Sequence, residues 1–177
     1  MRIPASCYRL QLSAEFTFDD ARRAAPYLRE LGVGDLYLSP VLAARPGSTH
    51  GYDVVDPTRV RAEIGGEAGL RALAAEAARL GMGLLVDIVP NHMAADHRNP
   101  WWWDVLRAGR NSAYAHVFDI DWDAPGCDGK VVLPVLDGAP QELIARGELR
   151  VAEEEGGAAL PYYDRRFPLA PASRAQA

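Results

Sequence analysis

The sequence predicts an α/β fold in which parallel strands alternate with helices. Over the first half of the chain, apolar segments of strand length alternate with amphipathic segments, which is the βαβα order of a parallel sheet. A glycine follows each expected helix, at Gly32 and Gly81, where a helix end favours a left-handed residue. Residues 83–89 include an unbroken Leu-Leu-Val run, typical of a parallel strand that is covered on both faces.

The other elements of the first half follow from local signals. Residues 6–12 alternate enough to form a strand, and Thr17 then provides a helix start ahead of acidic residues in the first turn. Pro26 predicts that this helix is kinked or that its first turn is split from the rest. A second strand is expected over residues 35–41. A long loop should follow it, and a second amphipathic helix should begin near Gly66.

The pattern changes after residue 93. Asn99 and Pro100 form a cap and first-turn pair for a short helix that ends near Gly109. Beyond this helix, apolar segments interrupted by proline or paired glycines predict further strands, of which the last two form a hairpin. These expected strands are residues 130–136, 148–154 and 158–163.

Composition limits the classes of function. The chain is 49% hydrophobic and 24% charged, which is ordinary for a soluble globular protein. With 24 acidic residues against 19 basic ones it lacks the basic stripe that a phosphate backbone requires, so we expect no nucleic-acid partner. No apolar run approaches the roughly 20 residues of a membrane-spanning helix, and the amino terminus does not read as a signal peptide. We therefore expect a cytoplasmic protein without a membrane partner; no oligomeric state is indicated.

The two cysteines indicate neither a disulfide framework nor a zinc site. Cys7 and Cys127 lie far apart in the sequence and have no CxxC spacing. We expect two buried free thiols.

Polar residues gather after the second and third expected strands. In parallel α/β folds, ligands bind at the carboxyl ends of the strands, and these ends lie at one edge of the sheet. We therefore expect one rim that carries two imidazoles, two carboxylates, a phenol and an amide. The six residues are His50, Tyr52, Asp53, Asp87, Asn91 and His92.

Two chemistries suit such a rim. Imidazoles and carboxylates could bind a divalent metal in a mixed nitrogen and oxygen site. The same groups could instead hydrogen-bond sugar hydroxyls, while Tyr52 offers an aromatic platform to the apolar face of the sugar. Compact ligand spacings such as HExxH do not occur, so the spacing favours sugar over a metal. The residues that would form the metal site are His50, Asp53, Asp87 and His92.

Two short motifs carry a resemblance to a known family. The segment DIVPNH, residues 87–92, resembles the first signature segment of the α-amylase family of glycoside hydrolases, and HGYD, residues 50–53, resembles the loop after strand two of that family. Longer segments are similar to the amino-terminal part of a trehalose-forming branch of the family. They are CYRLQL, LYLSPVLAARPGSTHGYDVVDPTRV, GLLVDIVPNHMAADHRNPWWWDVL, FDIDW and YYDRRFPLAP. The resemblance runs from Cys7 to about Pro171.

The resemblance implies a partial (β/α)8 TIM barrel. Residues 1–93 would supply its first three βα strands, and residues 94–177 would form a mixed α+β subdomain inserted before the remaining strands. The catalytic nucleophile and general acid of the family arrive on strands four and five. Nothing after residue 93 resembles the segments that carry them, so we expect a truncated copy that is inactive by itself.

The resemblance also implies roles for the rim residues. Asp87 and His92 would line the subsite of the sugar whose bond is broken, and Tyr52 would stack under that sugar. Asn91 matches a position that binds a structural calcium in many members of the family, although not generally in the trehalose-forming branch. Asp53 contacts a terminal hydroxyl in some relatives.

The activity implied is that of an isomerase in trehalose biosynthesis. It would be an intramolecular transglucosylase that converts the reducing-end α-1,4 linkage of a maltooligosaccharide into an α,α-1,1 linkage, without a cofactor. An α-amylase-type glucan hydrolase, a non-catalytic glucan-binding module and a metal-dependent hydrolase are the alternatives.

Three consecutive tryptophans form a further candidate contact with an α-glucan. Neighbouring positions on a helix point about 100° apart, so all three cannot line one site, and at least one should belong to the core. They are Trp101, Trp102 and Trp103.

Overall fold

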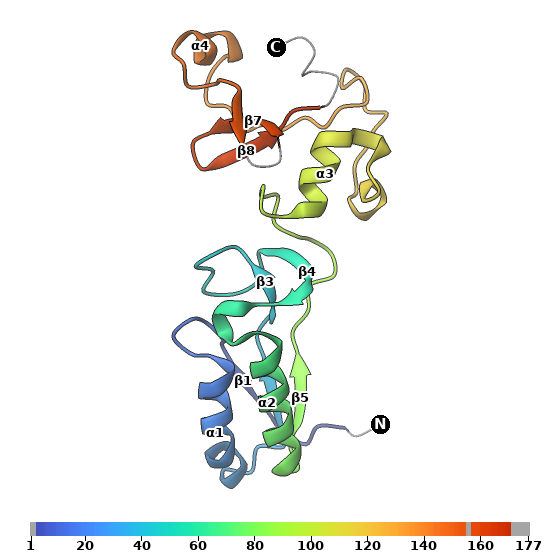
Figure 1. The fold of residues 1–177 in the computed structure, drawn as a ribbon. Helices are drawn as coiled ribbons and strands as arrows, with labels where there is room; N and C mark the ends of the chain where they lie inside the picture. The colour runs from blue at the N-terminus through green and yellow to red at the C-terminus, as the bar shows by residue number, and fades with distance from the viewer. Residues whose placement is uncertain (1–2, 155–156, 171–177) are drawn as a thin grey trace. The chain divides into compact units, whose positions relative to one another are not determined.

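The computed structural model describes residues 3–154 and 157–170, and the chain divides into two compact units, Met1–Ala94 and Ala95–Ala177 (Figure 1). The first unit contains a parallel sheet with two helices, and the second contains short helices with an antiparallel sheet. Each unit has its own cluster of buried apolar residues. The predicted α/β class is confirmed.

The parallel sheet has the strand order β1-β2-β5. Its strands are β1 (Cys7–Leu10), β2 (Asp35–Leu38) and β5 (Gly83–Val86). The pairing has no register shift: Arg9 lies opposite Tyr37, and Tyr37 lies opposite Leu85. The carboxyl ends of the three strands therefore lie at one edge, where the sequence places its polar rim.

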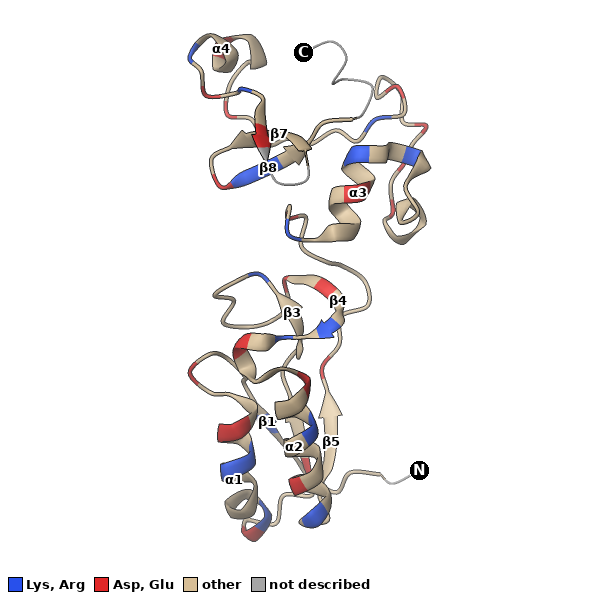
Figure 2. Ribbon diagram, viewed as in Figure 1, with Lys and Arg blue, Asp and Glu red and all other residues tan. Residues whose placement is uncertain are grey.

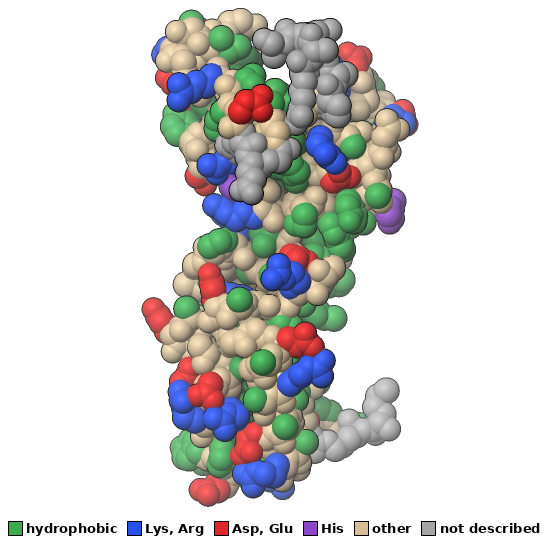
Figure 3. Space-filling view, in the orientation of Figure 1, with side chains coloured by type: hydrophobic (Ala, Val, Ile, Leu, Met, Phe, Trp, Pro, Cys, Tyr) green, Lys and Arg blue, Asp and Glu red, His purple; other side chains and the backbone are tan. Residues whose placement is uncertain are grey.

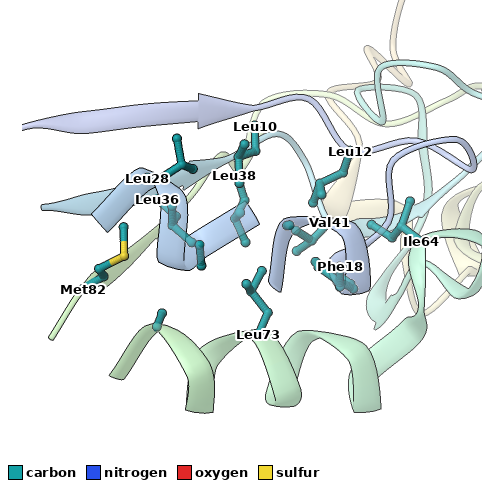
Figure 4. Packing of buried hydrophobic residues seen from close by; sticks show 13 residues of the cluster. Leu10, Leu12, Phe18, Leu28, Leu36, Leu38, Val41, Ile64, Leu73 and Met82 are labelled. Carbon is teal, nitrogen blue, oxygen red and sulfur yellow. The ribbon is translucent and has the colours of Figure 1, made fainter. Parts of the chain in front are cut away.

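Helices α1 (Phe18–Glu30) and α2 (Gly66–Arg79) pack against one face of this sheet. Figure 4 shows side chains from the strands and both helices meeting in this core; Leu73 of α2 has no exposed surface. The polar sides of the helices carry charges of both signs, as Figures 2 and 3 show. This division between an apolar and a charged side is the amphipathic pattern read from the sequence.

The first turn of α1 is closed by a capping box. The Thr17 hydroxyl accepts from the Asp20 backbone N–H at 3.4 Å, and Asp20 Oδ2 accepts from the Thr17 N–H at 2.9 Å. Pro26 lies inside one continuous helix, so the expected split of the first turn is wrong. The capping box and the packing of Ala21 and Ala25 into the core hold the helix together on the amino-terminal side of the proline.

A hairpin replaces part of the expected long loop. Strands β3 (Leu42–Ala44) and β4 (Val54–Val60) pair antiparallel with register shifts, and the 3₁₀-helix η1 (Ala62–Ile64) follows. Pro46, Gly47 and Gly51 lie in the segment between the strands, and such turn residues hide the pairing in the sequence. The segment that joins β3 to β4, residues 45–53, contains part of the candidate site.

Strand β5 is more exposed than its sequence predicts. Leu85 and Val86 each keep 39% of their surface exposed, and Ile88, two residues beyond the strand, keeps 65%. The expected coverage on both faces is therefore wrong within the described residues. The reason is that β5 is an edge strand of the described sheet. Cys7 is likewise exposed on the opposite edge strand, which corrects the expectation of a buried thiol; Cys127 is half-buried.

The second unit is held by α3 and a small antiparallel sheet. Its helices are α3 (Pro100–Ala108), η2 (Gly109–Asn111), η3 (Ala115–Val117) and α4 (Pro140–Ala145), and its strands are β6 (Ala152–Glu154), β7 (Gly157–Tyr162) and β8 (Arg165–Pro168). Asn99 caps α3 as predicted, and its Oδ1 accepts from Trp101 N at 3.1 Å. The predicted hairpin is confirmed and gains β8 as a third strand.

The expected strand over residues 130–136 is wrong. Pro134 removes a ladder donor, and no neighbouring strand pairs with this segment among the described residues. Of the helices that the structure describes, none combines the length and the apolar character needed to cross a bilayer.

The capping box predicts a pH dependence of stability. Hydrogen bonds from Thr17 and then from Arg23 lower the pKa of Asp20 from 3.8 to about 2. A carboxyl whose pKa is lower in the folded state stabilises the fold above its unfolded pKa and loses that contribution as the pH falls toward 2. Asp20→Asn should therefore lower the urea midpoint at pH 7, and its difference from the parent should narrow below pH 3.8. A difference that stays constant, or that also appears in the exposed control Asp128→Asn, contradicts this account.

Candidate functional site

Asp87 lies at the centre of the rim. Its backbone N–H donates to Leu38 O at 2.9 Å and so extends the β2–β5 ladder by one residue, which fixes the carboxylate at the strand ends. Asp87 Oδ2 accepts from the Tyr52 hydroxyl at 2.6 Å and from the Tyr37 hydroxyl at 3.2 Å. The side chain keeps 16% of its surface exposed, so solvent can reach it.

Arg9 joins this group from β1. Its Nη2 donates to the Tyr52 hydroxyl at 3.0 Å and lies 3.6 Å from Asp87 Oδ2, and its Cζ lies 5.4 Å from the centroid of the Tyr37 ring. Arg9, Tyr37, Tyr52 and Asp87 form one network, which we call the rim cluster. Sequence reasoning found Tyr52 and Asp87 and missed the other two. The sequence did contain a signal for them: side chains alternate between the two faces of a strand, and this alternation turns Arg9 and Tyr37 away from the helices.

A close backbone contact fixes the segment that carries Tyr52. Gly51 has φ +78°, and a Cβ at this position would lie 2.8 Å from Pro40 O. The Gly51 N–H donates to Ser48 Oγ at 3.1 Å, and Ser48 Oγ donates to Asp53 Oδ1. Asp53 thus stabilises the turn that presents Tyr52; its predicted contact with a sugar hydroxyl stays a prediction.

Arg61 supports the same turn from inside the unit. Its side chain is only 3% exposed, and its guanidinium donates to Ser48 O and to Glu63 Oε2. Glu63 Oε1 in turn accepts from Gly47 N at 3.2 Å. These bonds lower the pKa of Glu63 and keep the pair ionised. Residues 45–53 are therefore held from two sides.

His50 is held by the backbone of Tyr52. The Tyr52 N–H donates to His50 Nδ1 at 3.0 Å, so the neutral imidazole carries its proton on Nε2. The two rings are stacked, with centroids 5.9 Å apart and planes at 22°. His50 Nδ1 also lies 3.8 Å from Asp53 Oδ1. With 53% of the side chain exposed, the Nε2–H group is available as a donor to a ligand hydroxyl.

The environment keeps the Tyr52 hydroxyl protonated. Its hydrogen bond to the Asp87 carboxylate and its burial raise the pKa of Tyr52, while the bond from Arg9 opposes part of that rise. The hydroxyl therefore donates to Asp87 and accepts from Arg9 at neutral pH. Both of its hydrogen-bonding directions are used, which fixes the plane of the ring beside the carboxylate.

Asn91 and His92 lie beyond the rim cluster in the chain. Both are exposed, and His92 Nδ1 lies within hydrogen-bond distance of Asn91 Oδ1, at 3.1 Å. The contacts described above join His50, Tyr52, Asp53 and Asp87 into one region. That Asn91 and His92 converge on the same sugar stays a prediction.

The alternative of a metal site receives no support. It required His50, Asp53, Asp87 and His92 to meet at one point. Among the described residues no group of three or more His, Cys, Asp or Glu side chains is arranged to hold a metal ion.

The three tryptophans are half-buried, and two of them pack against aromatic rings of their own unit. Trp101 stacks on Tyr114 with centroids 5.3 Å apart, and Trp102 meets Phe118 at 5.2 Å with planes at 59°. None of the three lies in a described core cluster, and each keeps an intermediate exposure, so the expectation that at least one belongs to the core is wrong. A contact between Trp103, or either of the others, and a glucan stays a prediction.

Known proteins resemble this chain over most of its length. The catalytic domain of the α-amylase family matches residues 23–134. The structure of maltooligosyltrehalose synthase from Arthrobacter ramosus is 52% identical, with a TM-score of 0.84 over 95% of this chain and 21% of that chain. A protein of Mycobacterium tuberculosis H37Rv, provisionally named maltooligosyl trehalose synthase, is 49% identical over 95% of this chain and 22% of its own length.

More distant relatives share a shorter part of the chain. Palatinase from Erwinia rhapontici is 38% identical over 103 residues, which cover 58% of this chain and 18% of that protein. The chain spans about a fifth of the length of the relatives that it matches.

The contact at Gly51 predicts a position-specific effect of an added methyl group. Gly51→Ala should lower stability by about 1–3 kcal/mol, because alanine would be strained at φ +78° and its Cβ would meet Pro40 O. Gly47→Ala is the matched control, since Gly47 has φ +74° with no atom within 4 Å of an added Cβ. Urea unfolding of both variants measures the difference. Equal losses at the two positions would mean that the Pro40 contact does not hold the turn.

Proposed function

The chain belongs to the α-amylase family, and we propose that it is the amino-terminal part of an intramolecular transglucosylase that forms trehalose ends on maltooligosaccharides. The reaction converts the reducing-end α-1,4 linkage into an α,α-1,1 linkage and needs no cofactor. One observation carries the proposal: the rim cluster, with an aromatic ring beside a carboxylate, lies in a chain about half identical to maltooligosyltrehalose synthases.

In this proposal the first unit is the beginning of a (β/α)8 barrel. Three parallel strands in the order β1-β2-β5, with helices α1 and α2 on one face, are what the start of such a barrel requires. The exposed apolar side chains of β5 are consistent with a further strand pairing there in the whole protein. Residues 94–177 then form the subdomain inserted before the remaining strands.

The rim residues bind and orient substrate. Tyr52 stacks under the sugar whose bond is broken, Asp87 orients that sugar, and His92 donates to one of its hydroxyls. The other rim residues add hydrogen bonds around the same sugar: His50 through Nε2–H, Asp53 and Asn91. We assign Asn91 to the sugar and not to a metal ion.

Bond breaking is assigned to residues outside this chain. A retaining enzyme needs a carboxylate nucleophile and a carboxylic acid about 5–5.5 Å apart. Asp53 and Asp87 are engaged by Ser48 and by two tyrosines, which suits positioning groups. In the whole enzyme the nucleophile would form a glucosyl intermediate, and the released glucose, held in place, would attack it with its anomeric hydroxyl.

An α-amylase-type hydrolase is the second candidate, because the family match covers hydrolases as well. The full-length protein incubated with maltopentaose separates the two: the transglucosylase removes reducing ends without shortening the chain, and hydrolysis multiplies them. A non-catalytic glucan-binding module would do neither. We propose the cytoplasm as the site of the reaction and no nucleic-acid partner, on the composition given above.

Removing the carboxylate at the centre of the rim should affect turnover far more than folding. Asp87→Ala and Asp87→Asn in the full-length protein should each lower kcat/KM by about 10²-fold, because the reacting sugar loses an orienting charge. Thermal unfolding should show a small change by comparison. Activity near that of the parent would remove Asp87 from the substrate site.

The 177-residue chain by itself should not act on maltooligosaccharides. We expect weak glucan binding and a tendency to associate through the exposed apolar edge at β5. Chromatography of maltopentaose incubated with the purified chain tests this. Trehalose-terminated or shortened products that persist through repeated purification would show that the chain contains a catalytic pair.

A further inference from the structure

Arg9 has no role in the function proposed above, yet it contacts every other member of the rim cluster. Arg9 donates to the Tyr52 hydroxyl at 3.0 Å, lies 3.6 Å from Asp87 Oδ2, and places its guanidinium carbon over the Tyr37 ring, 5.4 Å from the ring centroid. Its side chain comes from the face of β1 that is turned away from the helices, and 37% of it is exposed. These three neighbours come from three separate parts of the chain: β2, the segment 45–53 and the end of β5.

The same arginine connects β1 with the segment that carries Tyr52. Arg9 Nη1 donates to Gln11 Oε1 at 2.7 Å, and Gln11 Nε2 donates to Thr49 O at 3.1 Å. Arg9 of β1 and Gln11, which directly follows the strand, therefore hold residues 45–53 at two points, the hydroxyl of Tyr52 and the carbonyl of Thr49. This arrangement uses separate nitrogens of one planar guanidinium, which a lysine ammonium cannot reproduce.

We propose that Arg9 is a positioning residue of the sugar site, acting through the Tyr52 hydroxyl. By donating to that hydroxyl, it directs the hydroxyl proton toward Asp87 and fixes the ring plane on which a sugar stacks. Arg9 is not placed at the reacting atoms, so its effect reaches the sugar through the Tyr52 hydroxyl, which in turn donates to Asp87. The inference rests on the proposed function, because it assigns Arg9 to the sugar site proposed there.

The contacts of Arg9 suit positioning better than stabilisation. Ion pairs between partly exposed groups contribute little to folding, because solvent screens the charges and ordering the side chains costs entropy. Misplacing a substrate-orienting group can reduce a rate by about 10²-fold. Loss of Arg9 should therefore change catalysis much more than it changes the unfolding temperature.

A double-mutant cycle in the full-length protein tests the inference. Arg9→Met keeps most of the side-chain length and removes the donors, and Tyr52→Phe removes only the hydroxyl that Arg9 contacts. We expect Arg9→Met to lower kcat/KM on maltopentaose by about 10- to 100-fold in the parent, and by less than about threefold in the Tyr52→Phe background. The loss should fall mainly on kcat, and free glucose should form a larger share of the product, because a loosely held sugar admits water.

Two further variants separate positioning from folding. Arg71→Met is the matched control, since Arg71 is 77% exposed on α2 and pairs only with Glu67 among its described ion pairs; it should retain the parental rate. Arg9→Lys keeps the charge, but its kcat/KM should remain at least about fivefold below that of the parent, because lysine lacks the planar guanidinium with its separate donor nitrogens. If Arg9→Met unfolds, Arg9→Lys in both backgrounds gives the same cycle.

Additive losses from Arg9→Met and Tyr52→Phe would overturn the inference, as would an Arg9→Met protein with the rate and product ratio of the parent. A parent that forms no trehalose ends would instead refute the proposed function. Calorimetric binding of maltopentaose to the same four proteins would then decide the Arg9 inference: non-additive losses of affinity support it, and additive or absent losses contradict it.

Discussion

The unshifted parallel pairing of β1, β2 and β5 is the constraint on which the rest of the structure depends. Because side chains alternate along a strand, this ladder turns Leu36 and Leu38 toward the helices and Tyr37 toward the opposite face. One register thus supplies both the hydrophobic core and the rim cluster. A slip by one residue would bury Arg9 and Tyr37 among leucines and leave Asp87 away from its two phenolic donors.

The sheet alone does not position Tyr52, which comes from residues 45–53. That segment is held by a buried arginine, Arg61, and by a carbonyl contact that only glycine tolerates at Gly51. Donors from Arg9 of β1 and from Gln11, just after that strand, also reach it. A charge as buried as that of Arg61 is tolerated because it is paired with Glu63 and bonded to a backbone carbonyl. The polar bonds that stabilise this turn therefore also set the geometry of the site.

The parts predicted from the sequence are those specified by local chemistry. Caps at Thr17 and Asn99 and strand-end residues such as Asp87 are recognisable from neighbouring residues alone. Arg9 and Tyr37 escaped recognition because each lies mid-strand, where its importance depends on which residue of another strand lies opposite. The strand prediction for residues 130–136 was wrong for the same reason. An alternation of apolar residues forms a strand only when a neighbouring strand provides the hydrogen bonds of a ladder.

Two tyrosine side chains, Tyr37 and Tyr52, donate to the same oxygen of Asp87, Oδ2, which also faces Arg9. A carboxylate has about four acceptor directions, so a ligand hydroxyl would approach Oδ1 while Oδ2 stays fixed by the protein. Such an arrangement favours orientation over nucleophilic attack, since a carboxylate that accepts from two phenols and lies 3.6 Å from an arginine nitrogen has less free charge density to offer. In the proposed reaction the early strands therefore orient the sugar, and the bond to its anomeric carbon must be broken by carboxylates from elsewhere in the whole protein.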